Sequence, residues 1–217
     1  MKGLLIKDFK LMKAQRNFFI FIIVIAIGMA MSTEDSSFII GYMTFVGLLF
    51  TMSTISYDEF ENGNYFLFSL PITRKGYTAE KYGFGLIVGG ISWLFATVVC
   101  IIAMLAKGSG SIMDTTLTAF LMLPILLVIF AIMLPFQLKY GGEKGRIAMI
   151  GAIGLMVVIG ILAVRIAKVL NIDLIRVFDN LPTISMRILI AIMLGIAIVI
   201  LFLSYRISVA IMNKKEF

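Results

Sequence analysis

The sequence predicts an all-α, polytopic membrane protein, on the evidence of its composition, its long apolar runs and the placement of its basic residues. Of the 217 residues, 61% are hydrophobic and only 14% are charged, and the mean hydropathy is +1.07. Soluble domains carry about 25% charged and about 45–50% apolar residues, so this composition cannot cover a water-exposed surface. We therefore expect lipid to be the solvent of a single transmembrane domain over residues 1–217.

Six apolar runs predict six membrane-spanning helices, since a spanning helix needs about 20 residues. The expected spans cover residues 18–33, 38–57, 82–106, 116–138, 147–164 and 188–205. The first run, Phe18–Met31, is short and reaches span length only with its polar neighbours. The basic segment before this run, its short apolar core and the sequence Ala30-Met31-Ser32 also fit a cleaved signal peptide, which is the alternative interpretation of the run.

The distribution of Lys and Arg predicts the orientation, because loops on the cytoplasmic side of a membrane are enriched in these residues. Fourteen of the 19 fall before the first span or after the second, fourth and sixth: Lys2, Lys7, Lys10, Lys13, Arg16, Arg74, Lys75, Lys81, Lys139, Lys144, Arg146, Arg206, Lys214 and Lys215. The other five are Lys107, Arg165, Lys168, Arg176 and Arg187. Both termini are therefore expected in the cytoplasm of a cell, which we expect to be bacterial.

Two segments outside the spans have amphipathic helical patterns. Near the N-terminus, Leu4, Leu5, Phe9 and Met12 share one helical face and the lysines lie elsewhere, which predicts a helix on the anionic inner leaflet. Before the sixth span, apolar residues from Ile166 to Leu181 recur at helical spacing, which predicts an amphipathic helix at the outer interface. This outer helix could be a lid over the bundle or a gate.

Several kinds of chemistry are missing from the sequence. It has no histidine, no Asp or Glu within the six runs and no GxxxxGK[ST] phosphate-binding loop. Catalytic residues, metal ligands, bound cofactors and nucleic-acid partners are therefore not expected, and an intramembrane enzyme is disfavoured. Neutral polar side chains remain as candidates for a substrate path: Ser53, Thr54, Ser56 and Thr97. Interhelical hydrogen bonding and ordinary packing are the favoured explanation of these residues, and the GxxxG of Gly85 and Gly89 likewise allows close helix packing.

The loop Asp58–Lys81 contains acidic residues, then an aromatic stretch from Phe60 to Phe68, then Leu70-Pro71. The stretch predicts an amphipathic helix that Pro71 ends. Acidic residues next to an anionic leaflet favour a protein partner. The alternative is a short re-entry loop whose aromatic residues anchor at the membrane interface.

Three segments resemble one protein family, the small-permease branch of ABC type-two exporter permeases. They are the opening M-K-G-L-L-I-K-D-F, the run S-L-P-I-T-R-K, and F-Q-L-K-Y-G-G-E-K-G-R at residues 136–146. The resemblance implies that two permease copies pair with two ATPase subunits, which bind ATP and Mg, and that a coupling helix follows the second span. The residues expected to contact the ATPase are Glu59, Glu61, Tyr65, Phe66, Phe68, Pro71, Lys139, Glu143 and Arg146.

The sequence thus favours a permease subunit that exports an amphipathic or hydrophobic cargo by alternating access, with a peptide or peptide-like antibiotic as the preferred cargo. Apolar span walls support this preference, because a hydrophilic solute would leave desolvated polar groups unpaired. A path between two bundles, and hence a dimer, is expected, because a single bundle has no polar pathway of its own. The alternative function is a non-transporting accessory or sensory membrane subunit.

Overall fold

The structure, a computed structural model, describes residues 2–33, 35–60, 63–108, 110–169 and 185–215, and in these residues all regular structure is helical. The helices are α1 (Lys2–Ala14), α2 (Arg16–Ser32), α3 (Ser36–Glu59), α4 (Gly63–Ser69), α5 (Arg74–Lys107), α6 (Ile112–Val169) and α8 (Met186–Lys214). The helix α6 is two helices joined at a kink at Gly141. The all-α prediction is confirmed.

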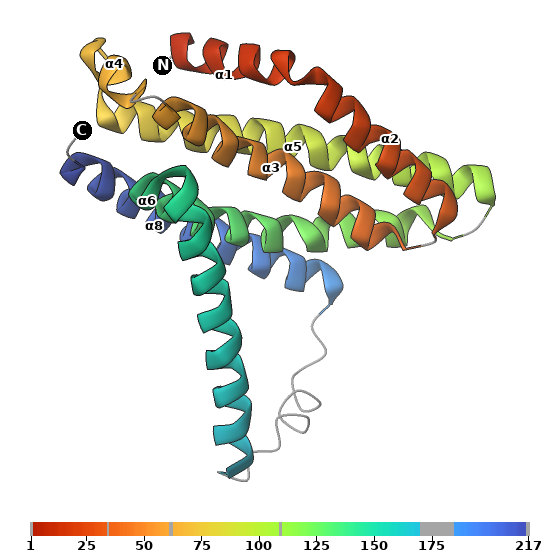
Figure 1. Ribbon diagram of the computed structural model, residues 1–217. Coiled ribbons are helices and arrows are strands. Elements are labelled where there is room, and N and C mark those ends of the chain that lie inside the picture. Colours follow the sequence, from red (N-terminus) through yellow and green to blue (C-terminus); the bar gives the residue numbers. More distant parts are fainter. Residues whose placement is uncertain (1, 34, 61–62, 109, 170–184, 216–217) are drawn as a thin grey trace.

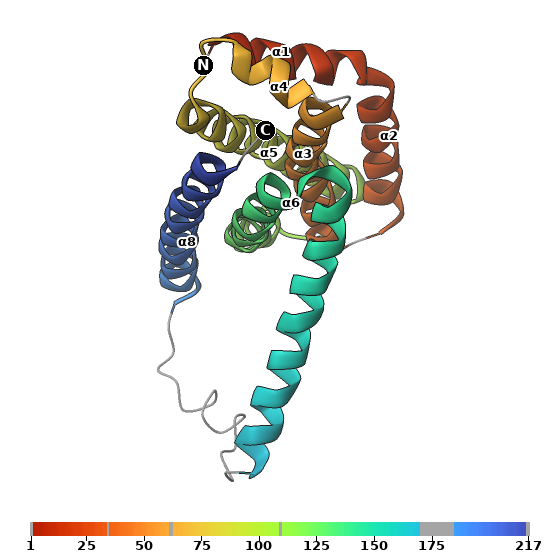
Figure 2. The same cartoon turned by 60° about the vertical axis from the view of Figure 1, so that its left-hand side comes forward.

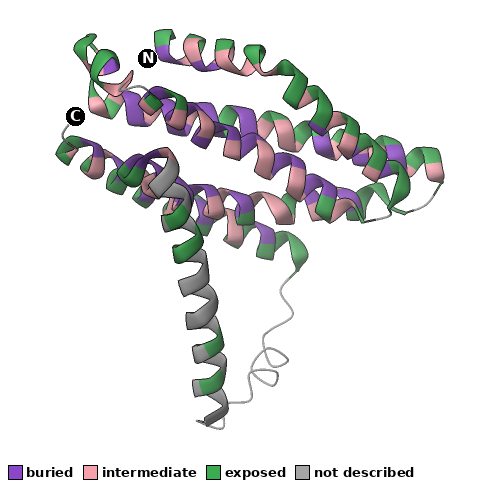
Figure 3. Ribbon diagram, viewed as in Figure 1, coloured by how far each residue is buried: buried purple, intermediate pink, exposed green. Residues whose placement is uncertain are grey.

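The central helix of the bundle is α3, which packs against both α5 and α6. The helix α8 lies along the first part of α6, and α1 and α2 cover the opposite side of the bundle (Figures 1 and 2). Beyond Gly141, α6 leaves the bundle and projects away from it (Figure 2). The outward faces of α2, α5 and α8 are largely exposed and apolar, as expected for surfaces that contact lipid (Figure 3).

The described residues contain four helices long and apolar enough to cross a membrane, or five if α1 and α2 form one bent span. The four are Ser36–Glu59, Arg74–Lys107, Ile112–Gly142 and Met186–Lys214. The first predicted run became the 17-residue helix α2, which is short for a span and joins α1 at a bend of 65°. The fifth predicted run, 147–164, lies in the part of α6 that leaves the bundle, so the count of six remains a prediction.

The helix α2 is a packed element of the bundle. Ala26 and Ala30 are buried in one apolar cluster with Ala96, Cys100 and Ala103 of α5. Small side chains at this crossing let the two helices approach closely. This packing favours an integral helix over a cleaved signal peptide for the first run.

Close packing was predicted for Gly85 and Gly89, and the structure confirms it. A Cβ atom on Gly85 would lie 2.3 Å from Phe130 of α6, and one on Gly89 would lie 2.4 Å from Leu48 of α3. A methyl group at either position would therefore require these side chains or α5 itself to shift. These two glycines thus allow the close contact of α5 with Phe130 and Leu48.

Two polar contacts fix α8 against the rest of the bundle. The hydroxyl of Tyr82 in α5 lies 2.5 Å from Ser204 Oγ and 2.9 Å from Ser208 Oγ, both in α8. The guanidinium of Arg74 donates to the carbonyls of Met212 (3.0 Å) and Asn213 (2.8 Å) in the last turn of α8, where carbonyls lack the usual helical partner four residues on. Of the predicted outer amphipathic helix, residues 166–169 form the end of α6 and the rest lies in residues 170–184, outside the described part of the chain.

Candidate functional site

Four segments that are distant in the sequence meet at one end of the bundle. They are α4, the kink at Gly141, and the regions next to the two chain termini (Figure 1). We call this the α4 end; the connection between α5 and α6 lies at the opposite end. The charge distribution assigned these same segments to one side of the membrane, and the fold brings them together.

The aromatic helix predicted after the second span is present as α4, and Pro71 follows it. Leu67 is buried and holds α4 to the bundle, whereas Tyr65 and Phe66 are 60% and 71% exposed. Phe66 and Tyr65 thus present two aromatic side chains at the outer surface of the α4 end.

The third aromatic residue predicted for this contact, Phe68, points inward. It packs against the main apolar cluster, and its ring meets that of Tyr77 edge to face, with 5.6 Å between the centroids. An aromatic pair of this geometry contributes about 0.5–1.5 kcal/mol beyond the burial of its area. Phe68 and Leu67 therefore anchor α4, and the exposed aromatic surface is smaller than the sequence suggested.

Glu59 is bonded within the chain. One carboxylate oxygen accepts from the backbone N–H of Gly142 at 2.9 Å, and the other pairs with Lys215 Nζ at 2.9 Å. Lys215 also donates to the carbonyl of Leu138. This clasp, Glu59 with Gly142 and Lys215, joins the end of α3, the kink of α6 and the C-terminal segment. Glu61, predicted beside it, lies outside the described residues.

The pair Gly141-Gly142 permits this clasp. Gly141 has φ 78°, a left-handed conformation that disfavours residues with a side chain. A Cβ atom on Gly141 would lie 2.5 Å from Glu59 Oε2, and one on Gly142 would lie 2.8 Å from Ser56 Oγ. These glycines therefore allow α3 and α6 to approach closely.

The second segment expected to contact the ATPase, residues 136–146, includes Lys139, whose side chain is exposed. Its ammonium group lies 4.9 Å from the centroid of the Tyr140 ring. The side chains of Glu143 and Arg146 are outside the described part of the structure.

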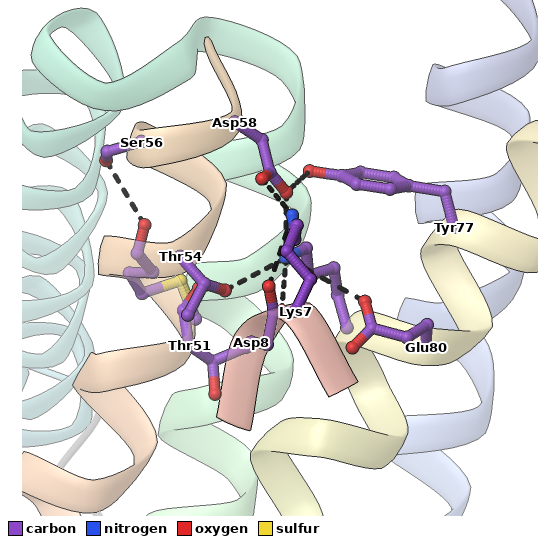
Figure 4. Close-up of polar contacts among 10 residues, drawn as sticks. Lys7, Asp8, Thr51, Thr54, Ser56, Asp58, Tyr77 and Glu80 are labelled. Carbon is purple, nitrogen blue, oxygen red and sulfur yellow. Dashed lines mark hydrogen bonds and ion pairs between the residues drawn. The ribbon is translucent and has the colours of Figure 1, made fainter. Parts of the chain in front are cut away.

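A buried ionic cluster, which the sequence did not predict, lies just inside the α4 end (Figure 4). At its centre is Lys81 of α5, with a fully buried side chain. Its Nζ atom lies 2.5 Å from Asp8 Oδ2 of α1 and 2.8 Å from Asp58 Oδ2 of α3, and it donates to Thr54 Oγ1 at 3.0 Å. A single ammonium group thus joins three helices.

Other side chains extend the cluster. Lys7 of α1 pairs with Asp58 and lies 3.2 Å from Asp8 Oδ1. The hydroxyl of Tyr77 donates to Asp58 at 3.0 Å. Glu80 is also buried, 3.7 Å from the Lys81 ammonium, and neither of its carboxylate oxygens has a hydrogen-bond partner. The cluster therefore holds more carboxylates than ammonium groups, and Glu80 is the poorly compensated one. The described residues contain no group of side chains suited to bind a metal ion.

The four candidate path residues do not form one surface. Ser53 and Ser56 line an open groove of about 540 Å³, and Phe60 is also part of its lining. Thr54 faces the interior and is bonded to Lys81. Thr97 lies on another helix, α5, where its hydroxyl donates to the backbone carbonyl of Trp93 one turn earlier. In this conformation, only Ser53 and Ser56 share a groove.

These features define a multi-pass α-helical membrane protein whose ends differ, with one end concentrating exposed aromatic residues, basic residues and an ionic cluster. The chain belongs to the ABC-2 family of transporters, because the profile of the family described as "ABC-2 family transporter protein" matches residues 3–213. Proteins of this family are membrane components of transporters and typically work with an ATPase partner. Searches of curated proteins and of solved structures gave no significant match.

Proposed function

We propose that this chain is the permease subunit of an ATP-driven exporter and that its ATPase is a separate protein that docks at the α4 end. The observation that carries the proposal is the exposed aromatic pair Tyr65 and Phe66, on a short helix anchored to the bundle in a chain of the ABC-2 family. Two permease copies, or this chain with a similar one, would pair with two ATPase subunits that hold ATP and Mg.

The proposed contact uses a helix that fits into a groove of the partner. An exposed aromatic pair at the end of a bundle is a suitable anchor, since interface hot spots are enriched in large aromatic side chains. Because Leu67 and Phe68 hold the inner face of α4, force applied to its outer face would reach the bundle through packed side chains. Pro71 then leads into α5 and restricts the connecting backbone.

The internal bonds of Glu59 change its proposed role. Its two oxygens are occupied by Gly142 and Lys215, so it supports the contact surface from inside and does not offer a charge at the rim. Lys139 is exposed at the same end of the bundle and is the remaining charged candidate of the second contact segment within the described residues.

The proposed cargo is amphipathic or hydrophobic, and a peptide or peptide-like antibiotic is preferred. Support comes from the apolar outward faces of the helices. The groove that Ser53 and Ser56 line would form part of a path completed by a second bundle. Deletion of the gene should raise sensitivity to such a peptide, and an effect confined to a hydrophilic solute would contradict this cargo.

The test of the proposed function is co-purification of the chain with its ATPase, followed by ATP turnover and transport in lipid vesicles. Tyr65→Ala and Phe66→Ala should each weaken ATPase binding by roughly 30-fold, the usual effect of truncating a hot-spot aromatic residue. Phe38→Ala is a matched control, because Phe38 is also an exposed aromatic residue but lies at the opposite end of α3.

Phe68→Ala provides a second comparison within the same helix. Because Phe68 packs inward, its loss should lower the thermal stability of the chain. Unchanged ATPase binding in both the Tyr65 and Phe66 variants would place the contact elsewhere. A chain that binds no ATPase and moves no cargo would instead support the alternative, an accessory or sensory membrane subunit.

A further inference from the structure

An apolar groove of about 480 Å³ opens on the side of the bundle between α2 and α5. Its floor is formed by α3 at Met43, Val46 and Gly47, and its walls include Phe19 and Phe95. The groove does not include any residue of α4, and it shares Val46 with the groove that contains Ser53 and Ser56.

The bend of 65° between α1 and α2 accounts for this opening. At the α4 end, Phe9 of α1 packs against Phe84 of α5, with 5.3 Å between the ring centroids. Towards the opposite end, α2 meets α5 again through Ala26 and Ala96. Between these two contacts, the bent pair α1 and α2 cannot stay in contact with the single helix α5 along its length. The groove opens there and faces the lipid.

Two basic residues, Lys13 and Arg16, border the groove at the bend. Both are exposed, and neither has a hydrogen bond or ion pair with any described residue. The groove lining includes no Asp or Glu. Gln15, between them, donates to Tyr57 Oη at 2.6 Å, which places the bend beside the last turn of α3. The two cations therefore lie near one end of the span, and the apolar groove runs inward from them.

We propose that this groove binds an anionic phospholipid from the leaflet at the α4 end, with an acyl chain in the groove and the phosphate at Lys13 and Arg16. The bilayer around the protein supplies the ligand. From Arg16 to Ile23 the groove extends for about 10 Å at ~1.5 Å per residue, which fits the upper part of an acyl chain within a leaflet of about 15 Å.

The charges select the headgroup. A guanidinium group binds phosphate oxygens through two parallel N–H donors, and Lys13 adds a second positive charge from the other side of the bend, three residues earlier in the chain. A zwitterionic headgroup brings its own cation to the site and gains less from this pair. The groove is lined by apolar side chains apart from Ser92 and the two basic residues at its border, so an acyl chain would cover little polar surface of the protein.

The test uses the purified full-length chain in detergent, titrated separately with phosphatidylglycerol and phosphatidylcholine, with bound lipid counted by native mass spectrometry. Wild-type protein should retain phosphatidylglycerol in preference to phosphatidylcholine. The double variant K13Q/R16Q should bind phosphatidylglycerol roughly 30-fold more weakly, from the loss of two basic contacts at a membrane surface. The matched control K75Q/R206Q removes one exposed Lys and one exposed Arg that do not border the groove, and should bind as wild type does.

A second variant tests the groove with its charges intact. Ile91→Trp places a larger side chain at an exposed position of the lining and should also reduce retention of phosphatidylglycerol. Equal retention of the two lipids by wild-type protein would overturn the proposal. So would an equal loss in K13Q/R16Q and the control pair, or full retention by Ile91→Trp, because each result would indicate adsorption by surface charge alone.

Discussion

Replacing Lys81 by Met should destabilise the chain more than any substitution of an exposed lysine. Methionine keeps much of the side-chain volume but removes the ammonium group, so among the described residues Lys7 would be the only cation left beside the buried Asp8 and Asp58. At an effective dielectric constant of about 20, two unit charges separated by the 2.8 Å between Lys81 and Asp58 attract by about 6 kcal/mol before desolvation is counted.

Desolvation of the three charges offsets part of that attraction. Loss of one partner from a buried ion pair typically costs about 3–5 kcal/mol, because the remaining charge stays buried without compensation. For a chain of this size, about 1 kcal/mol corresponds to about 2–4 °C, so Lys81→Met should lower the melting temperature by on the order of 10 °C. Lys75→Met, at an exposed position of the same helix, should change stability by less than about 0.5 kcal/mol.

The assay is the fraction of folded protein that remains in detergent after heating, measured by size-exclusion chromatography. The double variant Lys81→Met with Asp8→Asn gives the sharper result. Since Asp8→Asn removes one of the uncompensated carboxylates, the double variant should lose less than the sum of the two single losses. Strict additivity, or a Lys81→Met variant as stable as Lys75→Met, would refute the view that a single ammonium group joins these helices.

Three other predictions concern Glu80, Gly141 and the orientation of the chain in the membrane. Glu80→Gln should leave thermal stability unchanged or raise it, because the carboxylate is buried without a hydrogen bond, and a clear loss of stability would show that its charge is needed. Gly141→Ala should cost about 1–3 kcal/mol through its positive φ and its contact with Glu59, whereas Gly195→Ala, where a Cβ meets nothing within 4 Å, should be tolerated in the same melting assay. A cysteine at Lys214 should resist an impermeant thiol reagent in intact cells and one at Ser111 should react, and the reverse pattern would invert the proposed orientation.

The helical character of the chain was predictable because it depends on composition and on runs of apolar residues. The helix after the second span was predictable because aromatic residues and Pro71 are local signals. The bend between α1 and α2 was not, since it depends on how α1 packs on α5. The role of Gly141 and Gly142 was not predictable either, because it depends on Glu59, which is distant in the sequence and approaches only in the fold.

The ionic cluster had a signal in the sequence that was not used. Asp8 falls on the helical face that also carries Leu4 and Met12. A carboxylate on an apolar face is buried when that face packs, and a buried carboxylate requires a partner. Lys81 similarly lies on the face of α5 that carries Tyr77 and Phe84. The sequence could thus indicate that these charges are buried. It could not indicate that they meet, because Asp8 and Lys81 lie 73 positions apart.

The cluster also bears on how a movement of α4 would reach the spans. Phe68 packs on Tyr77, whose hydroxyl is bonded to Asp58, and Asp58 shares Lys81 with Asp8. A displacement of α4 must therefore either move Tyr77 or separate the rings of Phe68 and Tyr77. If Tyr77 moves, its hydroxyl disturbs the carboxylate of Asp58, which pairs with both Lys7 and Lys81. Contacts alone do not establish energetic coupling. The double-variant cycle measures the innermost link of this route, and the Phe68 variant removes the outermost one, so the two experiments together test whether α4, α5 and α1 respond as one body.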